Sequence, residues 1–141
     1  MKRINVYFGL VLFAAIMFSS CKNDNADGII TDESIPPVIT TFSTANTFKY
    51  NIVAVKYTKQ EVYELKVTAD SIRYSLSAAS IKSGQMEVIV ELKDGSKLLS
   101  RNISGVTSAA DYRKVKSPLS KITLNYSNYT GEFTFNLNDA Y

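Results

Sequence analysis

The acidic residues are the first side chains in this sequence whose spacing could support catalysis. Two carboxylates held a few ångströms apart can hydrolyse a glycosidic bond, and the chain offers Glu61 with Glu64 and Glu87 with Glu91. Glu87 and Glu91 alternate with the apolar residues of the stretch 86–92, as on a half-buried strand. We therefore interpret them as part of a solvated strand face rather than as a catalytic pair.

The residue types that are missing restrict the chemistry further. The sequence has no histidine and a single cysteine. It therefore has no Ser-His-Asp or Cys-His nucleophile, and no zinc site built from imidazoles or several thiolates. A serine–lysine dyad stays open, because several serines lie near lysines, although lysine-rich loops produce such neighbours by chance. We predict a protein that is not an enzyme and that binds no cofactor and no metal.

Nine tyrosines offer a different chemistry, since a phenol ring has apolar faces and a hydrogen-bonding hydroxyl. Two of them, Tyr126 and Tyr129, directly follow Asn125 and Asn128. Exposed rings can stack on sugars, and amides can bind sugar hydroxyls. If the domain binds a glycan, we predict these four residues as its ligands. The alternative is that tyrosine is a good strand residue whose hydroxyl reaches water.

The elements that would position these residues are predicted to be strands. From Val38 onward apolar and polar residues alternate with a period of two. The letters KDGS at 93–96 predict a hairpin turn, because Gly95 can adopt a positive φ. The segment 121–137 predicts a second hairpin, with its turn in the letters SNYTG. The segment 107–120 breaks the alternation and predicts a long loop or one short helix.

This pattern predicts an all-β domain over residues 38–141, an antiparallel β-sandwich (Ig-like or Greek-key) of about seven or eight strands. The stretch SGQMEVIVELKDGSKLLSRNISG, followed by YSNYTGEFTFNL, resembles the β-sandwich domains of small lipoproteins of Bacteroidota. The resemblance implies the fold and carries no activity.

The N-terminus has the organisation of a secretory signal. A basic start, MKRIN, precedes the uncharged stretch Val6–Phe18, which is shorter than the roughly 20 residues of a spanning helix. The small residues Ser19 and Ser20 then suit a signal peptidase. We predict that residues 1–20 are a cleaved signal peptide.

The only cysteine follows this signal directly. The letters FSSC resemble the bacterial lipobox, with Phe18 at the position where leucine is commonest. The resemblance implies cleavage before Cys21 and acylation of its sulfur. Two or three acyl chains give a lasting membrane anchor, whereas one chain gives marginal binding. The alternative is an ordinary secretory signal with a chance cysteine near the cut.

Residues 21–37 are polar and acidic and end in two prolines, which predicts a flexible tether. Within them Asn23–Ser34 nearly fits a calcium loop but lacks the final glutamate ligand, so we favour the tether. Lys22, in place of aspartate after the cysteine, favours the outer membrane by resemblance to lipoprotein sorting. SSCKND is also similar to surface-export signals of Bacteroidota, which favours the cell surface over the periplasmic face.

Two further observations concern modification and partners. Asp70, Ser71 and Ile72 resemble the Asp-Ser/Thr-aliphatic motif for O-glycosylation in Bacteroidota, which implies a glycan on Ser71. Loss of Lys2 and Arg3 with the signal would lower the formal charge from +3 to +1. Because the remaining basic residues are dispersed, we predict no nucleic-acid partner.

The sequence thus predicts a lipid-anchored lipoprotein of the outer membrane. Its predicted function is that of a non-catalytic binding or accessory subunit, with an outer-membrane protein as its partner. The alternative is a glycan-binding β-sandwich module at the cell surface.

Overall fold

The computed structural model describes residues 35–140. The predicted signal peptide, Cys21 and most of the predicted tether therefore lie outside the described residues. The described part of the chain contains no helix that is long and apolar enough to cross a membrane. It forms seven strands, all paired antiparallel. They are β1 (Val38–Ser43), β2 (Thr47–Glu64), β3 (Ser71–Ala78), β4 (Ser83–Leu92), β5 (Lys97–Ile103), β6 (Thr107–Lys114) and β7 (Leu119–Asp139).

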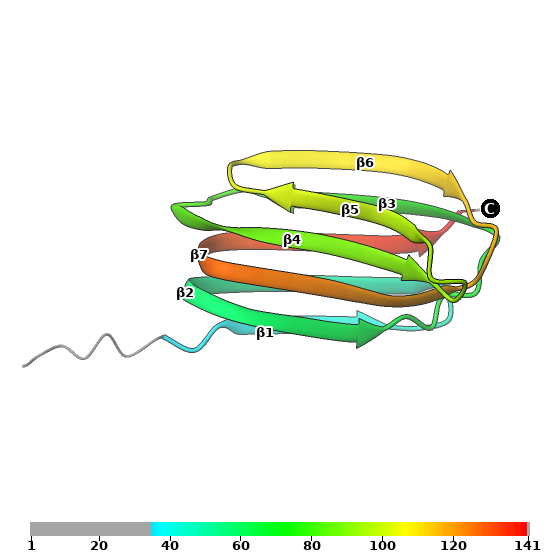
Figure 1. Cartoon of the computed structure of the whole chain (residues 1–141), viewed down its shortest axis with the longest axis horizontal. Helices are drawn as coiled ribbons and strands as arrows, with labels where there is room; N and C mark the ends of the chain where they lie inside the picture. Colours follow the sequence, from blue (N-terminus) through cyan, green and yellow to red (C-terminus); the bar gives the residue numbers. More distant parts are fainter. Residues whose placement is uncertain (1–34, 141) are drawn as a thin grey trace, which may run out of the picture. The chain divides into compact units, whose positions relative to one another are not determined.

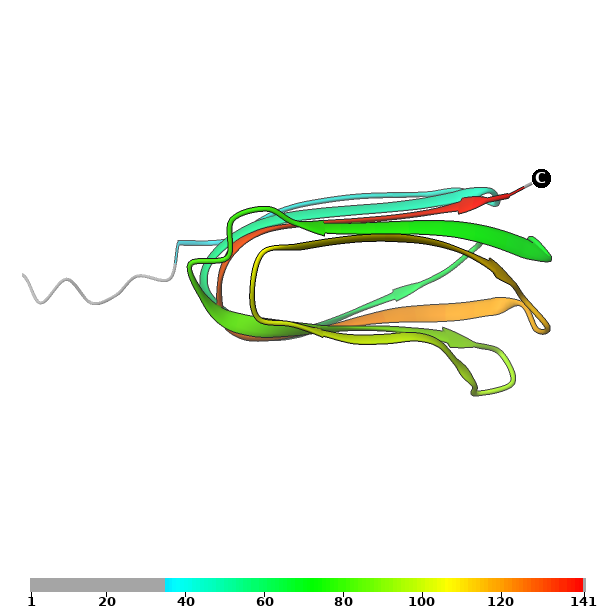
Figure 2. The ribbon, with the colours of Figure 1, turned by 90° about the horizontal axis from the view of Figure 1, so that it is seen from above.

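The two longest strands, β2 and β7, connect two layers. They have 18 and 21 residues and pair with each other along most of their length. Both bend near the middle, where their register shifts between Ala54 and Lys59. Each strand therefore contributes one half to each layer, as Figures 1 and 2 show. We name the layers sheet I and sheet II. Sheet I has the order β1, β2 (47–54), β7 (131–139), β3, β6, and sheet II has the order β2 (59–64), β7 (119–126), β4, β5.

This strand order is that of a jelly roll, in which two Greek keys wrap into a sandwich. The prediction of an all-β antiparallel sandwich is confirmed, and of the two topologies predicted the chain adopts the Greek-key one. The predicted turn at 93–96 is also present, joining β4 to β5 with a φ of 83° at Gly95.

The corner between the sheets is held by two threonines. Lys56 and Asn128 adopt a left-handed backbone, with φ values of 50° and 49°. The N–H of Lys56 donates to Thr130 Oγ1 at 2.9 Å, and the N–H of Asn128 donates to Thr58 Oγ1 at 2.8 Å. In each strand a threonine hydroxyl thus accepts an N–H of the other strand. At the bulge this bond replaces a backbone hydrogen bond of the sheet.

Two glycines allow other backbone segments to approach this corner. Gly84 has a φ of 74°, and a Cβ there would lie 2.1 Å from the carbonyl oxygen of Asn128. A Cβ on Gly131 would lie 2.8 Å from the carbonyl oxygen of Ser80. Neither position accepts a side chain unless the backbone moves.

Two elements differ from the prediction. The second hairpin predicted in 121–137 is wrong, because β7 continues through SNYTG as one strand that bends alongside β2. The loop or helix predicted for 107–120 is also wrong over Thr107–Lys114, which forms β6. β6 lies at the edge of sheet I and pairs with β3 alone. An edge strand with little burial has no need of alternating apolar residues, so its sequence carries a weak strand signal.

The core lies between the sheets and follows the predicted alternation. In β3, in β4 from Met86 onward, and in the sheet I halves of β2 and β7, every second side chain points inward and is buried. Full burial of one large aliphatic or aromatic side chain stabilises the fold by about 1.5–3 kcal/mol. The largest fully buried side chains include Phe48, Tyr50, Ile52, Ile72, Met86, Ile122, Leu124, Tyr129, Phe133 and Phe135. The residues that alternate with these along each strand point outward and form the two outer faces.

Candidate functional site

The outward side chains of sheet I form rows that cross its five strands. We call this surface the sheet I face. The central row is Phe42, Lys49, Asn136, Ser75 and Ala110. The row on its corner side is Thr40, Asn51, Thr134, Ser77 and Ser108. The row on its other side is Thr47, Asn138, Arg73 and Tyr112. Most of these side chains are short and polar, so they make a low floor that can hydrogen bond.

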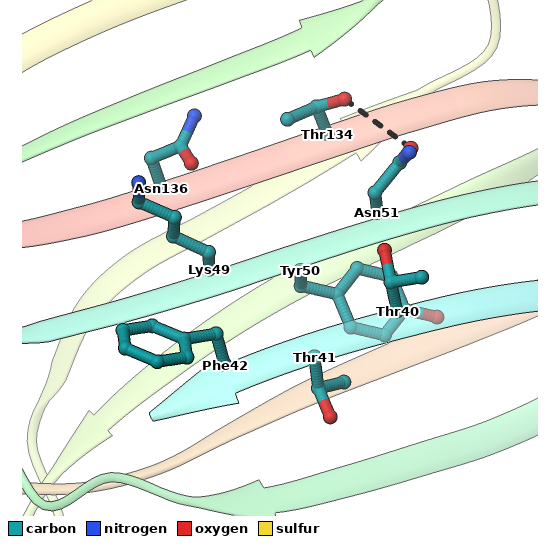
Figure 3. A pocket seen from close by; sticks show the side chains of 8 residues that line it. All are labelled: Thr40, Thr41, Phe42, Lys49, Tyr50, Asn51, Thr134 and Asn136. Carbon is teal, nitrogen blue, oxygen red and sulfur yellow. Dashed lines mark hydrogen bonds between the residues drawn. The ribbon is translucent and has the colours of Figure 1, made fainter. Parts of the chain in front are cut away.

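A surface pocket of about 280 Å³ lies on this face over β1, β2 and β7 (Figure 3). Its polar walls hold few strong internal hydrogen bonds. Thr134 Oγ1 lies 3.4 Å from Asn51 Oδ1, and Asn136 Nδ2 lies 3.4 Å from Ser75 Oγ. These distances are long for hydrogen bonds, so the groups keep capacity for a ligand. The lining residues are Thr40, Thr41, Phe42, Lys49, Tyr50, Asn51, Thr134 and Asn136.

Two aromatic rings flank the floor. Phe42 on β1 is 55% exposed and Tyr112 on β6 is 47% exposed. β1 and β6 are the edge strands of sheet I, so the rings stand at its opposite sides. An aromatic ring exposed to water is unfavourable in free energy, so a ligand that covers it gains affinity. Two rings on either side of a polar floor suit a ligand that has both apolar and hydroxylated surfaces.

The outer face of sheet II has similar residues, but they are hydrogen-bonded or ion-paired with one another. Gln60 Nε2 donates to Asn125 Oδ1 at 2.8 Å, and Asn125 Nδ2 donates to Glu87 Oε2 at 3.1 Å. Lys121 and Glu91 form an ion pair at 3.0 Å. We call this surface the sheet II face. It has a smaller pocket of about 160 Å³, next to Glu87 and Asn125. Its polar groups already bind one another.

The four residues predicted as glycan ligands do not form one site. Asn125 points outward on the sheet II face, and Asn128 is exposed at the corner. Tyr126 and Tyr129 are 4% and 0% exposed, because both rings point into the core. A buried ring has no free face, so the structure does not support stacking of a sugar on either tyrosine. The bend in β7 explains this outcome, since it turns both rings inward on either side of Asn128.

The two buried tyrosines belong to an aromatic cluster inside the sandwich. The hydroxyl of Tyr126 donates to that of Tyr50 at 3.0 Å, and its ring lies 5.2 Å from Tyr57 and 5.5 Å from Tyr129. Burial raises the pKa of Tyr126 above its ordinary value and that of Tyr129 to about 12. These phenols therefore stay protonated and act as packing groups.

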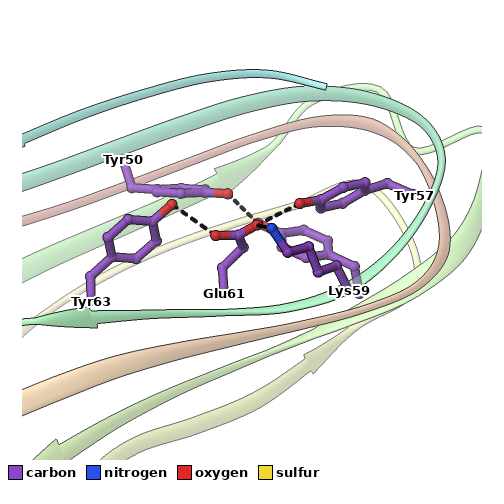
Figure 4. A network of polar contacts seen from close by, with 6 residues as sticks. Tyr50, Tyr57, Lys59, Glu61 and Tyr63 are labelled. Atoms are coloured by element: carbon purple, nitrogen blue, oxygen red, sulfur yellow. Dashed lines mark hydrogen bonds and ion pairs between the residues drawn. The ribbon is translucent and has the colours of Figure 1, made fainter. Parts of the chain in front are cut away.

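A second polar cluster surrounds Glu61, whose side chain is 14% exposed (Figure 4). Tyr57 and Tyr63 donate to its two oxygens at 2.5 and 3.2 Å, and Lys59 Nζ lies 3.0 Å from Oε1. Burial by itself would raise the pKa of Glu61. The hydrogen bond from Tyr57 and the contact with Lys59 outweigh burial and hold the pKa below its usual value. The carboxylate is thus ionised, and its partners all come from β2 itself, where they hold the side chains next to the bend of this strand in place.

The carboxylate pairs named from the sequence are separated. Glu61 points into the sandwich, whereas Glu64 is exposed on the other side of β2. Glu87 and Glu91 share the sheet II face but lie four residues apart on one strand, or about 14 Å. Carboxyl groups in glycoside hydrolases are roughly 5–10 Å apart. Within residues 35–140 no group of three or more potential ligands is placed to hold a metal ion.

Two sequence predictions concern modification. Ser71 begins β3, is half-buried and pairs with Lys114, and its carbonyl accepts the N–H of Ala140. Its glycosylation stays a prediction. Acylation of Cys21 concerns a residue outside the described part of the chain, and it also stays a prediction.

Sequence reasoning missed the sheet I face. One signal was present: in FTFNLN the residues between the buried Phe133, Phe135 and Leu137 are the short polar Thr134, Asn136 and Asn138. That alternation indicates a polar outer surface. It does not say which strands lie beside β7, and the rows exist only across neighbouring strands.

Comparisons with known proteins give no family. No family model matches the chain, and no curated protein matches it. Solved structures that resemble it include a protein of Bacillus endospore appendages, which form disulfide-linked pili (12% identity, TM-score 0.45, 74% of this chain and 92% of that chain). A family 35 carbohydrate-binding module from Clostridium thermocellum is 10% identical, with a TM-score of 0.43 over 74% of this chain and 88% of that chain. A carbohydrate-binding module from Cellvibrio mixtus lichenase 5A, solved with cellotriose, is 11% identical, with a TM-score of 0.41 over 77% and 91%. At these identities the functions of those proteins do not transfer to this chain.

Proposed function

We propose that the domain is a non-catalytic glycan-binding module whose ligand lies on the sheet I face. The observation that carries this proposal is the pair of exposed rings, Phe42 and Tyr112, on either side of a floor of short polar side chains. A sugar has apolar C–H faces that pack on aromatic rings. It also has hydroxyls that bind amides and hydroxyls such as those of Asn51, Asn136 and Thr134.

The sheet II face is the weaker candidate because its polar groups are engaged. A ligand there would have to break the bonds that join Gln60, Asn125 and Glu87 before it made its own. On the sheet I face Thr47 Oγ1 donates to Asn138 Oδ1 at 2.5 Å, but the contacts of Asn51 and Asn136 beside the pocket are 3.4 Å long, so a ligand loses little by replacing them.

The proposal includes the location predicted from the sequence. Acylation of Cys21 would anchor the module in the outer membrane, with the cell surface favoured, where it would meet extracellular glycans. Mass spectrometry of the mature protein tests this part. An acylated N-terminal Cys21 supports it, and a free thiol or a cut elsewhere contradicts it.

Glycan binding is tested by retention of the full chain on beads that carry a panel of polysaccharides. Phe42→Ala and Tyr112→Ala should each weaken binding of the retained glycan by about two- to tenfold, since an aromatic contact contributes roughly 0.5–1.5 kcal/mol beyond its buried area. The matched control is Asn102→Ala, an exposed position on the sheet II face, which should bind like the wild type. Circular dichroism would verify that each variant is folded.

If no polysaccharide retains the protein, the glycan proposal is wrong. Co-purification with an outer-membrane protein would then favour the other function predicted from the sequence, an accessory subunit of an envelope complex.

A further inference from the structure

The sheet I face has a charge pattern as well as a shape. Lys49 and Arg73 point outward in its rows, Lys114 points outward next to them, and the one outward carboxylate, that of Glu132, lies beyond the corner row. Glu132 pairs with Val53, at the corner end of the face. Among residues 35–140, neither Lys49 nor Arg73 forms an ion pair with a carboxylate. Both cations are therefore available to a ligand.

Each of these two cations stands directly beside one of the exposed rings. Phe42 and Lys49 are register partners across β1 and β2, and Arg73 and Tyr112 are register partners across β3 and β6. Cβ atoms of residues paired in this way lie about 4.5–5.5 Å apart. A ring and a cation at this spacing can contact one sugar residue together, the ring packing on its face and the cation binding a charged substituent.

We propose that the sheet I face binds an acidic glycan through two half-sites, Phe42 with Lys49 and Tyr112 with Arg73. This inference rests on the proposed glycan-binding function. The glycan is a chain with carboxylate or sulfate groups. Arg73 offers two parallel N–H donors to such a group, and Lys49 offers a compact charge.

The two half-sites are spaced so that one extended chain can meet both. Lys49 lies two strands away from Arg73 and two residues along. Strands about 4.8 Å apart and a rise of about 3.4 Å per residue place the two Cα atoms roughly 12 Å from each other. Asn136 and Asn138 lie on β7, between the strands of the two cations, and Ser75 lies beside Asn136 on β3. Asn138 Oδ1 accepts a hydrogen bond from Thr47 Oγ1, so we expect Asn136, Ser75 and the Nδ2 group of Asn138 to bind the hydroxyls of the intervening sugar.

The sheet II face provides an internal contrast. There Glu64, Glu87 and Glu91 stand against Lys97 and Lys121, and Lys121 is paired with Glu91. That face has a surplus of acids, so an acidic chain would be repelled from it. Of the two faces, only the sheet I face is therefore expected to bind an acidic glycan.

The experiment measures the binding of the full chain to beads that carry polygalacturonic acid, its methyl ester or dextran sulfate. The wild type should bind polygalacturonic acid or dextran sulfate at low salt and lose most of this binding at about 1 M salt. Lys49→Met and Arg73→Met should each weaken it about fivefold. The double variant should weaken it about 25-fold, because sites this far apart act almost additively.

Lys97→Met is the matched control, since it removes the same charge from an exposed position on the sheet II face. It should bind like the wild type, and an equal loss in this variant would overturn the proposal by showing general attraction of a basic protein to polyanions. Equal binding of the methyl ester, unchanged by Lys49→Met and Arg73→Met, would overturn the acidic selectivity and leave glycan binding intact. If the wild type binds none of the three probes but another polysaccharide of the wider panel retains it, the acidic selectivity is wrong and glycan binding stands. If no glycan of either set retains it, both proposals are wrong.

Discussion

The two outer faces of the sandwich are built from similar residues and differ in how these residues are used. Both present asparagines, serines, threonines and lysines. On the sheet II face the side chains of Gln60, Asn125 and Glu87 form a chain of hydrogen bonds at 2.8 and 3.1 Å. On the sheet I face Asn51 and Asn136 make contacts of 3.4 Å, and Lys49 has no ion-pair partner in the described residues.

This difference separates stabilising polar groups from ligand-binding ones. A polar group that is already bonded contributes to folding, and its removal leaves a partner unsatisfied. A polar group that makes no internal hydrogen bond contributes little to folding, and its donors and acceptors can bind a ligand instead. The type of residue does not distinguish the two cases, so the composition of a face is a poor guide to its role. Substitutions that compare bonded with unbonded groups test this distinction directly.

The largest effect is expected at the corner that places both faces. Gly84→Ala should destabilise the domain by about 3 kcal/mol, because the new Cβ would meet the backbone oxygen of Asn128 and the φ of 74° is unfavourable for alanine. Urea denaturation followed by circular dichroism measures the change. Gly95→Ala is the control: its φ is 83° but nothing lies near the new Cβ, so the cost should stay near 1 kcal/mol. Equal costs at the two positions would show that close approach at the corner is unimportant.

The next effect concerns a bonded carboxylate in the interior. Glu61→Gln should lower the free energy of unfolding at pH 7 by about 1–3 kcal/mol, since the amide cannot accept hydrogen bonds from Tyr57 and Tyr63 on both of its heavy atoms. The pKa of Glu61 is lowered in the folded state, so its charged form stabilises the fold. This contribution is complete above the ordinary value of 4.5 and disappears as the pH falls through the folded-state pKa.

The difference between wild type and Glu61→Gln should therefore narrow below pH 4.5 in urea unfolding curves. Glu64→Gln, on the exposed side of the same strand, is the matched control and should show little change in stability at any pH. A difference for Glu61→Gln that stays constant from neutral pH to about pH 3 would show that ionisation of this group does not stabilise the fold.

The smallest effects compare the two faces themselves. Asn125→Ala should lower stability by about 1 kcal/mol and leave glycan binding unchanged, because the amide joins Gln60 to Glu87. Asn136→Ala should change stability by less than about 0.5 kcal/mol and weaken glycan binding severalfold. Thermal unfolding and bead retention on the same two proteins give both values. The opposite result, with stability lost at Asn136 and binding lost at Asn125, would assign the site to the sheet II face.

Several features of the fold could be predicted because they depend on local patterns. Alternation in 48–54 and 133–137 identified residues that are now seen to be buried, since a half-buried strand must separate apolar from polar side chains at every step. The turn at 93–96 was predictable because Gly95 supplies the positive φ that a tight turn needs.

Other features could not be predicted because they depend on partners far along the chain. The letters SNYTG look like a turn, yet β7 continues through them because β2 bends beside it and Thr58 binds the N–H of Asn128. The burial of Tyr126 and Tyr129, predicted as ligands if the domain binds a glycan, could not be read from the sequence, since a period of two does not say how a bulge will rotate the residues around it. β6 had no apolar alternation because it is an edge strand that pairs with β3 alone.

The sequence by itself determined the β class of this protein, the identity of its main core positions and one hairpin turn, because each follows from the chemistry of neighbouring residues. It also supports predictions of a signal peptide, an acylated Cys21 and a tether from short patterns. Only the tertiary structure decided which outward residues share a surface. Phe42, Lys49 and Asn136 come together because β1, β2 and β7 lie side by side, and strand pairing depends on the packing of the whole sandwich.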